Sequence, residues 1–264
     1  MEKGLISNIQ GYSIKDGPGI RTTVFCVSCN LRCKWCSNPE LMLPGKKTMK
    51  FKIGDKEKIQ NVGYEIDSKT LAEKLARDKI FYEETGGGVT FSGGEAALQG
   101  KFVAETARLL SEMGISSALD TAGNVSREVF EEISDAFEYI LYDIKTFDEE
   151  LHKKCTGVSN RRILENLKFL AAKNKKIIIR LVIVPHYNDE LNDVRKRMEF
   201  VKNLGDCVER IDVLPYHTLG KGKYKSLGME YPIKSGEEIS DEYWREFKKI
   251  AANLNLEIHV AGEN

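Results

Sequence analysis

Three cysteines on one short segment are the residues of this chain best suited to chemistry. The segment "CNLRCKWC" contains Cys29, Cys33 and Cys36, and Cys26 lies just upstream. Soft thiolates this close together on a polar loop favour an iron–sulfur cluster. A cluster held by three cysteines keeps one iron open to a substrate, whereas a fourth ligand would limit it to electron transfer. The spacing therefore predicts a cluster whose missing fourth ligand is functional.

Three other interpretations of the cysteines compete with a cluster. Two zinc-binding pairs, Cys26 with Cys29 and Cys33 with Cys36, would stand only three residues apart, which is cramped for a structural zinc site. A redox pair would need two cysteines and would leave Cys29 unexplained. Core packing is the usual role of isolated cysteines, but it is unusual for three of them beside charged residues.

Alternating strands and helices must position this loop. Apolar or β-branched runs predict strands over 21–27, 88–92, 116–120, 139–143, 176–184, 210–215 and 256–260. Helical periodicity follows over 70–83, 102–113, 127–133, 160–173, 189–203 and 241–254. Repeated strand–helix–strand units with nearly continuous apolar strands predict a parallel sheet with helices outside. We therefore expect an α/β fold, a single partial (β/α)6-type barrel over residues 1–264 with small N-terminal and insertion elements.

The region 43–68 interrupts this alternation. Its Lys- and Gly-rich sequence includes "TMKFKIG" and "EKIQNVG", whose alternation predicts a small hairpin closed around Gly54 and Asp55. No cysteine lies between Cys36 and Cys155, so a cysteine-rich ferredoxin-like insert is absent from the sequence.

Polar or glycine-rich segments follow six of the expected strands. They are the cysteine loop, "SGGEA" (92–96), "DTAG" (120–123), "DIK" (143–145), the Pro–His pair at 185–186, and "PYHTLGKGK" (215–223). Asp143 and Lys145 alternate along their strand end, so both side chains are expected to point into the same space. Because ligands of such folds collect at the C-terminal ends of the parallel strands, these segments predict one shared site.

Composition narrows the class of protein. Forty Lys plus Arg balance forty Asp plus Glu, which argues against general nucleic-acid binding and against electrostatic attachment to a membrane. No segment has the pattern of a signal peptide or the length of a transmembrane span. The expected location is the cytoplasm, where thiols stay reduced and six cysteines indicate metal or redox chemistry.

The cysteine segment resembles the C-x3-C-x-aromatic-C signature of the radical S-adenosylmethionine (SAM) superfamily, with Trp35 in the aromatic position. In that superfamily the cysteines hold one [4Fe-4S] cluster, and its open iron chelates SAM. Further segments narrow the resemblance to glycyl radical enzyme activating enzymes over about residues 5–230. They are "DGPGIRTTVF" (16–25), "TGGGVTFSGGEA" (85–96), "YDIK" (142–145), "TGVSN" (156–160), "RLVIVP" (180–185) and "LPYHTLGKGKYKSLG" (214–228).

The resemblance implies roles for individual residues. Cys29, Cys33 and Cys36 are the expected cluster ligands, and Asp16 is expected to face the glycine loop of a partner protein. The residues expected at the SAM site are Trp35, Ser37, Gly93, Gly94, Asp120, Thr121, Asp143, Ile144, Lys145, Arg180 and His217. The resemblance also leaves room for a monovalent cation there.

Some of these residues have plain structural interpretations as well. The alternatives are that Trp35 is a packing residue, "DTAG" a helix cap and turn, and His217 a core histidine. Arg180 interrupts an apolar run, and a buried guanidinium needs a partner. That partner is either the carboxylate of SAM or an acidic side chain of the protein.

The family reaction is reductive cleavage of SAM, followed by removal of a hydrogen from one backbone glycine of a glycyl radical enzyme. "SGGEA", "TGVSN" and "PYHTLGKGK", with no ferredoxin-like insert, favour pyruvate formate-lyase as the partner. "CSNPE" (36–40) and the 43–68 region keep a dehydratase- or decarboxylase-type partner open. A radical SAM enzyme acting on a small molecule and a zinc-stabilised interaction module are the alternatives. The resemblance also implies flavodoxin or ferredoxin as electron donor, and we expect a monomer.

Overall fold

The computed structural model describes residues 1–53, 56–234 and 238–262, and its main element is one nine-stranded sheet. The strands are β1 (Lys3–Ser13), β2 (Arg21–Cys26), β5 (Tyr64–Asp67), β6 (Gly88–Gly93), β7 (Ser116–Thr121), β8 (Tyr139–Asp143), β9 (Lys176–Ile183), β10 (Val208–Pro215) and β11 (His259–Val260). They lie in the order β11-β10-β9-β8-β7-β6-β2-β1-β5. Within the sheet, every pair of neighbouring strands between β2 and β11 is parallel. At the other end of the sheet, β1 pairs antiparallel with both β2 and β5.

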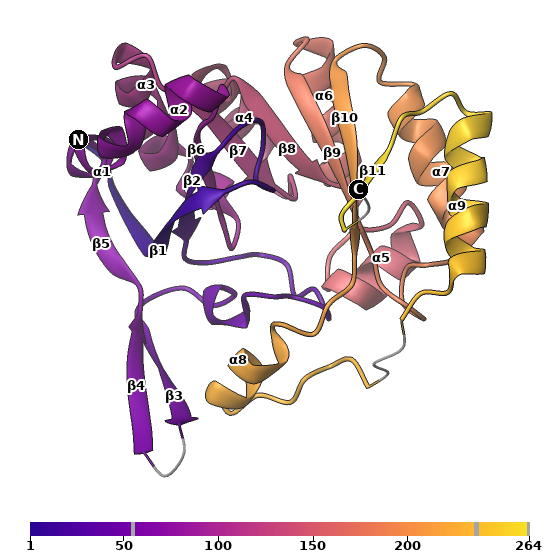
Figure 1. Ribbon diagram of the computed structural model, residues 1–264, viewed down its shortest axis with the longest axis horizontal. Coiled ribbons are helices and arrows are strands. Elements are labelled where there is room, and N and C mark those ends of the chain that lie inside the picture. The colour runs from indigo at the N-terminus through magenta and orange to yellow at the C-terminus, as the bar shows by residue number, and fades with distance from the viewer. Residues whose placement is uncertain (54–55, 235–237, 263–264) are drawn as a thin grey trace.

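The helices lie mostly on the outer side of this sheet, with the short helix at residues 221–226 apart from it, at the bottom of the view (Figure 1). They are α1 (Ser68–Leu75), α2 (Lys79–Thr85), α3 (Gly100–Glu112), α4 (Arg127–Ile133), α5 (Glu149–Thr156), α6 (Arg161–Ala172), α7 (Leu191–Lys202), α8 (Lys221–Ser226) and α9 (Asp241–Asn253). The helix predicted over 70–83 is divided, because a 3-10 turn at Ala76–Asp78 separates α1 from α2. The sequence pattern does not predict α5 and α8, which are short.

Each central strand divides its side chains between two faces. In β8, Ile140 and Tyr142 pack in the main core with residues of the helices, while Leu141 belongs to a small inner cluster with Ala118. Asp143 lies on the inner face as well, at the end of the strand. The alternation follows from the two-residue period of a strand. The prediction of an α/β fold with an open, mostly parallel sheet is confirmed, with β5 and β11 at the open ends.

The N-terminal strand β1 is absent from the sequence-based expectations. Its sequence contains Gly4, Asn8 and Gly11, which are weak strand formers, and its pairing with β2 is interrupted by two register shifts. It gains its stability from pairing on both sides. The expected strand over 256–260 is reduced to the two residues of β11.

The region 43–68 forms a hairpin that projects from the body of the molecule (Figure 1). Its strands are β3 (Lys47–Ile53) and β4 (Lys56–Val62), paired antiparallel. The predicted turn residues, Gly54 and Asp55, lie outside the described residues. At the base, Met49 and Val62 pack against Val27 and Leu41, so the hairpin is anchored beside the start of the cysteine loop.

Candidate functional site

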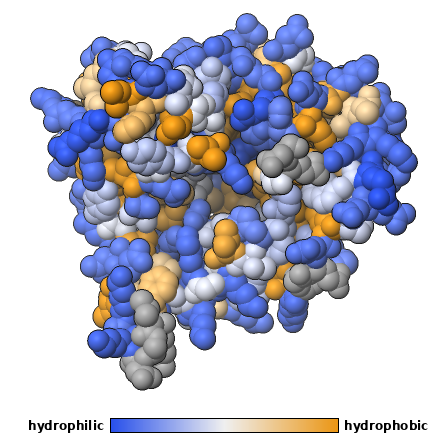
Figure 2. All heavy atoms as spheres, in the orientation of Figure 1, coloured by the Kyte–Doolittle hydropathy of each residue, from blue (hydrophilic) through white to orange (hydrophobic). Residues whose placement is uncertain are grey.

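A cavity of about 660 Å³ lies at the C-terminal ends of the parallel strands. The space-filling view shows a hollow near the centre of the molecule (Figure 2). The lining includes all but one of the predicted site residues: Asp16, Cys29, Cys33, Trp35, Cys36, Ser37, Gly93, Gly94, Asp120, Thr121, Asp143, Lys145, Arg180 and His217. The exception is Ile144, which is buried in the main core and whose backbone N–H donates to the Arg180 carbonyl at 3.1 Å.

The cysteine loop begins where β2 ends and follows the wall of the cavity. Cys29, Cys33 and Cys36 line the cavity, whereas Cys26 is fully buried in the main core on the opposite face of β2. Burial raises the pKa of Cys29 and of Cys33 to about 12 and that of Cys36 to about 11. These thiols therefore stay protonated at neutral pH unless a cationic group such as a metal centre binds them.

The arrangement of these thiols indicates whether they suit a single metal ion or an iron–sulfur cluster. Among the residues that the structure describes, no group of three or more His, Cys, Asp or Glu side chains is gathered to hold a single metal ion. A [4Fe-4S] cubane binds each cysteine through a different iron, so its three ligand sulfurs stand farther apart than around one ion. Three soft donors spread along one cavity wall fit that group.

The C-terminal end of α5 supports the cysteine loop from outside. The carbonyls of Cys155 and Thr156 accept hydrogen bonds from the N–H groups of Lys34 at 3.0 Å and Arg32 at 2.7 Å. Two loop residues that flank Cys33 are thereby fixed by α5. The position of that cysteine therefore depends on a helix that the sequence pattern does not predict.

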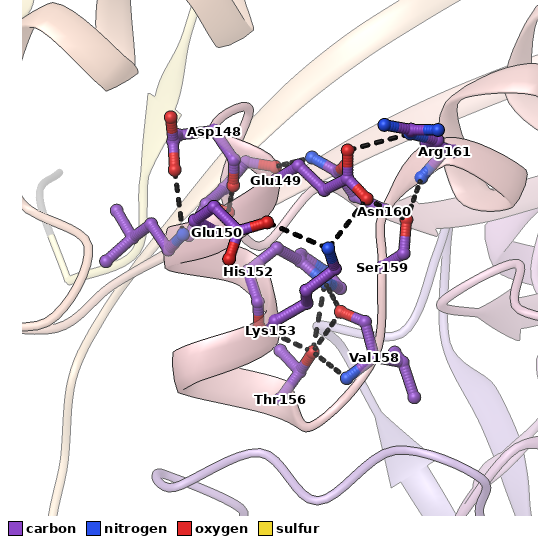
Figure 3. Close-up of polar contacts among 12 residues, drawn as sticks. Asp148, Glu149, Glu150, His152, Lys153, Thr156, Val158, Ser159, Asn160 and Arg161 are labelled. Atoms are coloured by element: carbon purple, nitrogen blue, oxygen red, sulfur yellow. Dashed lines mark hydrogen bonds and ion pairs between the residues drawn. The ribbon is translucent and has the colours of Figure 1, made fainter.

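The end of α5 is itself held by a dense set of polar contacts (Figure 3). His152 is buried, and its Nδ1 lies 2.7 Å from the Val158 carbonyl, while the Thr156 hydroxyl donates to the His152 carbonyl at 2.8 Å. Glu149 binds Arg161 across the turn at 2.7 Å. The segment "TGVSN" therefore acts in this structure as a rigid turn behind the cysteine loop.

Gly93 ends β6 and Gly94 follows it, and close packing of the protein backbone requires glycine at both positions. A Cβ added at Gly93, whose φ is +108°, would lie 2.5 Å from the backbone N of Cys26. A Cβ at Gly94 would lie 2.2 Å from the Ser28 carbonyl oxygen. Glycine thus lets the end of β6 approach the start of the cysteine loop, in addition to any contact with SAM.

Glu95 joins the ends of β6 and β7. Its buried carboxylate accepts hydrogen bonds from the Thr121 hydroxyl at 2.6 Å and from the N–H groups of Ala97 at 3.1 Å and Ala122 at 2.9 Å. Burial raises the pKa of Glu95 to about 7, although these three bonds favour the ionised form. The Thr121 hydroxyl, predicted at the SAM site, is therefore engaged within the protein.

Four charged residues meet at the cavity floor, and we call Asp120, Asp143, Lys145 and Arg180 the charged quartet. Arg180 Nη1 lies 2.9 Å from Asp120 Oδ2, and its Nε lies 3.9 Å from Asp143 Oδ1. Lys145 Nζ lies 2.7 Å from Asp143 Oδ2. Arg180 is thus paired with acidic side chains of the protein, the second of the two interpretations of its burial.

The two carboxylates of the charged quartet differ in their pKa shifts, and both keep hydrogen-bonding capacity for a ligand. Burial raises the pKa of Asp120 despite Arg180, whereas Lys145 and Arg180 outweigh burial and lower the pKa of Asp143. Within the described residues, the buried Oδ1 atoms of Asp120 and Asp143 accept no hydrogen bond. In the part of the chain that the structure describes, Asp120 Oδ1 is without a hydrogen bond and Asp143 Oδ1 has only its 3.9 Å ion-pair contact with Arg180. Both can therefore accept from a ligand with donor or cationic groups, such as the ammonium group and ribose hydroxyls of SAM.

Comparison with known proteins agrees with this geometry. Residues 23–200 match the model of the radical SAM superfamily. This chain belongs to the radical SAM superfamily. A pyruvate formate-lyase-activating enzyme of Clostridium pasteurianum is 37% identical over 256 residues, which cover 96% of this chain and 99% of that protein. A trans-4-hydroxy-L-proline dehydratase activating enzyme of Clostridioides difficile is 35% identical over 299 residues, covering 96% and 98%.

Solved structures give the same family. A domain of a pyruvate-formate lyase-activating enzyme from Bacteroides vulgatus superposes with a TM-score of 0.57 and 27% identity, covering 67% of this chain and all of that domain. Within the radical SAM superfamily, this chain is a member of the glycyl radical enzyme activating enzymes. No helix in the described part of the chain is long and apolar enough to cross a membrane.

Trp35, the aromatic residue of the radical SAM signature, has two environments. It is 6% exposed and packs against Cys155, Val184 and Ile233, and it also lines the cavity. Its buried indole N–H has no hydrogen-bond acceptor among the described residues. Packing accounts for its burial, and the unpaired donor is open to a ligand.

Asp16 lies at the cavity wall within the "DGPGIR" segment. Its Oδ2 accepts hydrogen bonds from the hydroxyls of Ser13 at 2.6 Å and Thr23 at 2.7 Å. Its backbone carbonyl accepts from the Thr90 hydroxyl, which in turn accepts from Nε of the fully buried Arg21, each at 2.6 Å. Arg21 thus fixes the Asp16 segment to β6, a role that the sequence reasoning missed although the residue lies within the quoted motif.

Several further residues line the cavity but were not predicted from the sequence, although each lies beside a predicted site residue. They are Lys15, Asn38, Val182, Tyr216 and Leu219, each one or two positions from a predicted site residue. Proximity in the sequence was the available signal. Ser37 lines the cavity as predicted, and His217 is exposed there instead of buried in the core.

Two substitutions in the charged quartet test its role toward SAM. We expect Asp143→Asn and Lys145→Met each to weaken SAM binding by about 1–3 kcal/mol, because each removes a charged partner from the cavity floor. Iron content should stay near normal, since neither side chain belongs to the cysteine loop. Anaerobic calorimetry with SAM gives the affinity.

A surface ion pair provides the matched control for the charged quartet. Lys173 Nζ lies 3.1 Å from Asp135 Oδ2, away from the cavity lining, so Asp135→Asn and Lys173→Met should leave SAM affinity unchanged. Wild-type affinity in both Asp143→Asn and Lys145→Met would count against the assignment of the charged quartet to SAM.

Proposed function

We propose that this activating enzyme cleaves SAM reductively and generates the glycyl radical of pyruvate formate-lyase. The observation that carries the proposal is the single cavity that brings together the cysteine loop, the glycine end of β6 and the charged quartet. When bound, a reduced [4Fe-4S] cluster supplies the electron that splits SAM into methionine and a 5′-deoxyadenosyl radical. Removal of one glycine hydrogen from the partner completes the reaction.

The roles proposed for the residues follow from their positions. Cys29, Cys33 and Cys36 are proposed as the cluster ligands, with Asp16 toward the partner's glycine. SAM is proposed to contact the side chains or backbone of Trp35, Ser37, Gly93, Gly94, Asp120, Thr121, Asp143, Ile144, Lys145, Arg180 and His217. For Ile144 the backbone is the available group, because its side chain lies in the core. The protein's contribution is to hold the reacting groups in position and to exclude water.

Several further features belong to the same proposal. The Oδ1 atoms of Asp120 and Asp143 support a monovalent cation as an additional component of the site. We propose a single-domain monomer that works in the cytoplasm and receives its electron from flavodoxin or ferredoxin. The reduced state of cytoplasmic thiols is compatible with six unpaired cysteines.

The choice of pyruvate formate-lyase rests on the alignments. The Clostridium pasteurianum relative aligns over 256 positions with almost complete coverage of both chains. The alignment with the Clostridioides difficile dehydratase activator extends over 299 positions, 35 more than the 264 residues of this chain. That relative therefore has at least 35 residues without a counterpart here, as expected where an insert is absent. Similar identities, 37% and 35%, keep a dehydratase-type partner as the second candidate.

Electron paramagnetic resonance tests the partner directly. Reduced enzyme and SAM are mixed anaerobically with pyruvate formate-lyase or with a glycyl radical dehydratase, and the glycyl doublet is recorded. We expect the doublet with pyruvate formate-lyase, because its glycine loop must fit this cavity mouth. A doublet with the dehydratase alone would show that the dehydratase, and not pyruvate formate-lyase, is the partner. Turnover of a small molecule with no doublet from either protein would overturn the activating function.

A further inference from the structure

A second cavity, of about 490 Å³, lies beside the cysteine loop. Lys34 lines it, whereas the residues on either side of Lys34, Cys33 and Trp35, line the main cavity. Cys155 also lines the second cavity, and it packs in one cluster with Cys33 and Trp35. One layer of residues therefore separates the second cavity from a proposed cluster ligand.

The second cavity is basic. Its described lining includes Lys34, Lys154 and Lys234 and no Asp or Glu. The chain as a whole has net charge zero, so this concentration of positive charge is local. The neighbouring Lys153 differs, because Glu149 and Glu150 neutralise it at 3.0 and 2.8 Å (Figure 3).

Two of these lysines, Lys34 and Lys154, lie close to Cys155. Lys34 Nζ lies 5.5 Å from the centre of the Tyr187 ring, which also lines the cavity. Lys154 directly precedes Cys155 on α5, and the backbone N–H of Lys34 donates to the Cys155 carbonyl at 3.0 Å. The positive charge thus gathers over the thiol that separates the two cavities.

The proposed function requires an electron from outside, and a donor that docks away from the main cavity leaves that cavity free for SAM and the partner's glycine loop. We propose that the second cavity is the docking surface for an acidic one-electron carrier protein. The proposal rests on the proposed function and adds the place where reduction occurs. In the step the carrier loses one electron, the cluster gains it, and no atom is transferred.

Charge complementarity and size both suit such a partner. A positive patch facing a negative one accelerates encounter and fixes orientation. Electron-transfer complexes are short-lived and bury little surface, so a small docking surface is sufficient for such a partner. The attraction must weaken as salt screens it.

The test uses the reconstituted holoenzyme with Lys34→Glu, Lys154→Glu and, as a matched control, Lys101→Glu on α3. Lys101 is exposed, and α3 and α5 lie on opposite sides of the molecule in Figure 1. Calorimetry measures the affinity of oxidised flavodoxin and of oxidised ferredoxin at low and high salt, without SAM or reductant. Stopped-flow absorbance measures cluster reduction by each reduced carrier and by photoreduced deazaflavin, a small donor that needs no docking surface.

We expect at least one carrier to bind the wild type in a salt-sensitive manner. Lys34→Glu and Lys154→Glu should each weaken that binding and slow reduction by the carrier roughly 10-fold or more, given the charge dependence of such encounters. Lys101→Glu should behave as wild type, and deazaflavin should reduce all four proteins equally. If Lys34→Glu loses iron, Lys154→Glu decides, because its side chain is not on the cysteine loop.

Three outcomes would overturn the docking proposal. They are wild-type affinity in Lys154→Glu, equal weakening by Lys101→Glu, and binding of inorganic phosphate but of neither carrier. Failure of the proposed function has a different appearance: wild-type enzyme reduced by deazaflavin would then leave SAM uncleaved.

Discussion

Replacing Cys29, Cys33 or Cys36 by alanine should abolish SAM cleavage, whereas Cys26→Ala should retain it. The three cysteines line the main cavity, and Cys26 lies in the core on the other face of β2. A strand fixes the direction of its side chains, so Cys26 cannot turn toward the cavity without breaking the pairing of β2 with β6. Loss of one of the three proposed ligands removes a cluster attachment that no other cysteine of the cavity lining replaces.

Iron content, the visible absorption of the anaerobic protein and methionine release measure this result. Cys207→Ala is the matched control, because Cys207 is buried in the main core far along the chain. A Cys26→Ala protein with a normal cluster and no SAM cleavage would falsify the assignment of three ligands and one open iron. Full iron content and activity in Cys33→Ala would do the same.

Asp193→Ala should lower the free energy of unfolding by about 3–5 kcal/mol, the usual cost of leaving a buried charge without its partner. Asp193 lies 2.9 Å from Arg197 on α7, and Arg197 is fully buried. The same carboxylate accepts hydrogen bonds from the N–H groups of Phe147 at 2.9 Å and Asp148 at 2.8 Å. Removal of Asp193 therefore leaves two backbone donors unsatisfied and takes from Arg197 its acidic partner, so that the buried cation keeps only two backbone carbonyls as hydrogen-bond acceptors among the described residues.

Chemical denaturation measures this loss, with Glu199→Ala as the control. Glu199 is exposed on the same helix, so its removal should change the free energy of unfolding by less than about 0.5 kcal/mol. The double variant Asp193→Leu with Arg197→Met should recover part of the loss, because it removes both charges. A loss in Asp193→Ala no larger than that of the control would contradict the assigned role.

Sequence reasoning located the site well because strand ends are easy to recognise. The runs that became β2, β6, β7, β8, β9 and β10 are apolar and end in polar or glycine-rich segments. In a parallel sheet those ends meet at one edge. The prediction that Asp143 and Lys145 point the same way depended only on the two-residue period, and both line the cavity.

Sequence reasoning failed where tertiary contacts determine the structure. The helix α5 has eight residues and is stabilised by contacts such as that of His152 with Val158, which periodicity does not report. The partner of Arg180 remained undecided because Asp120 approaches it from a different strand. The sequence pattern does not show that three donors from two segments converge on Glu95.

The support that α5 gives to the cysteine loop also bears on the order of events during synthesis. Cys29, Cys33 and Cys36 are made before Cys155 and Thr156, whose carbonyls fix their loop. Until those carbonyls are in place, the nascent cysteines form part of a loop without its final shape. We therefore expect the cluster to be assembled on a chain that has already folded as far as α5, because only then does the cysteine loop have its final shape.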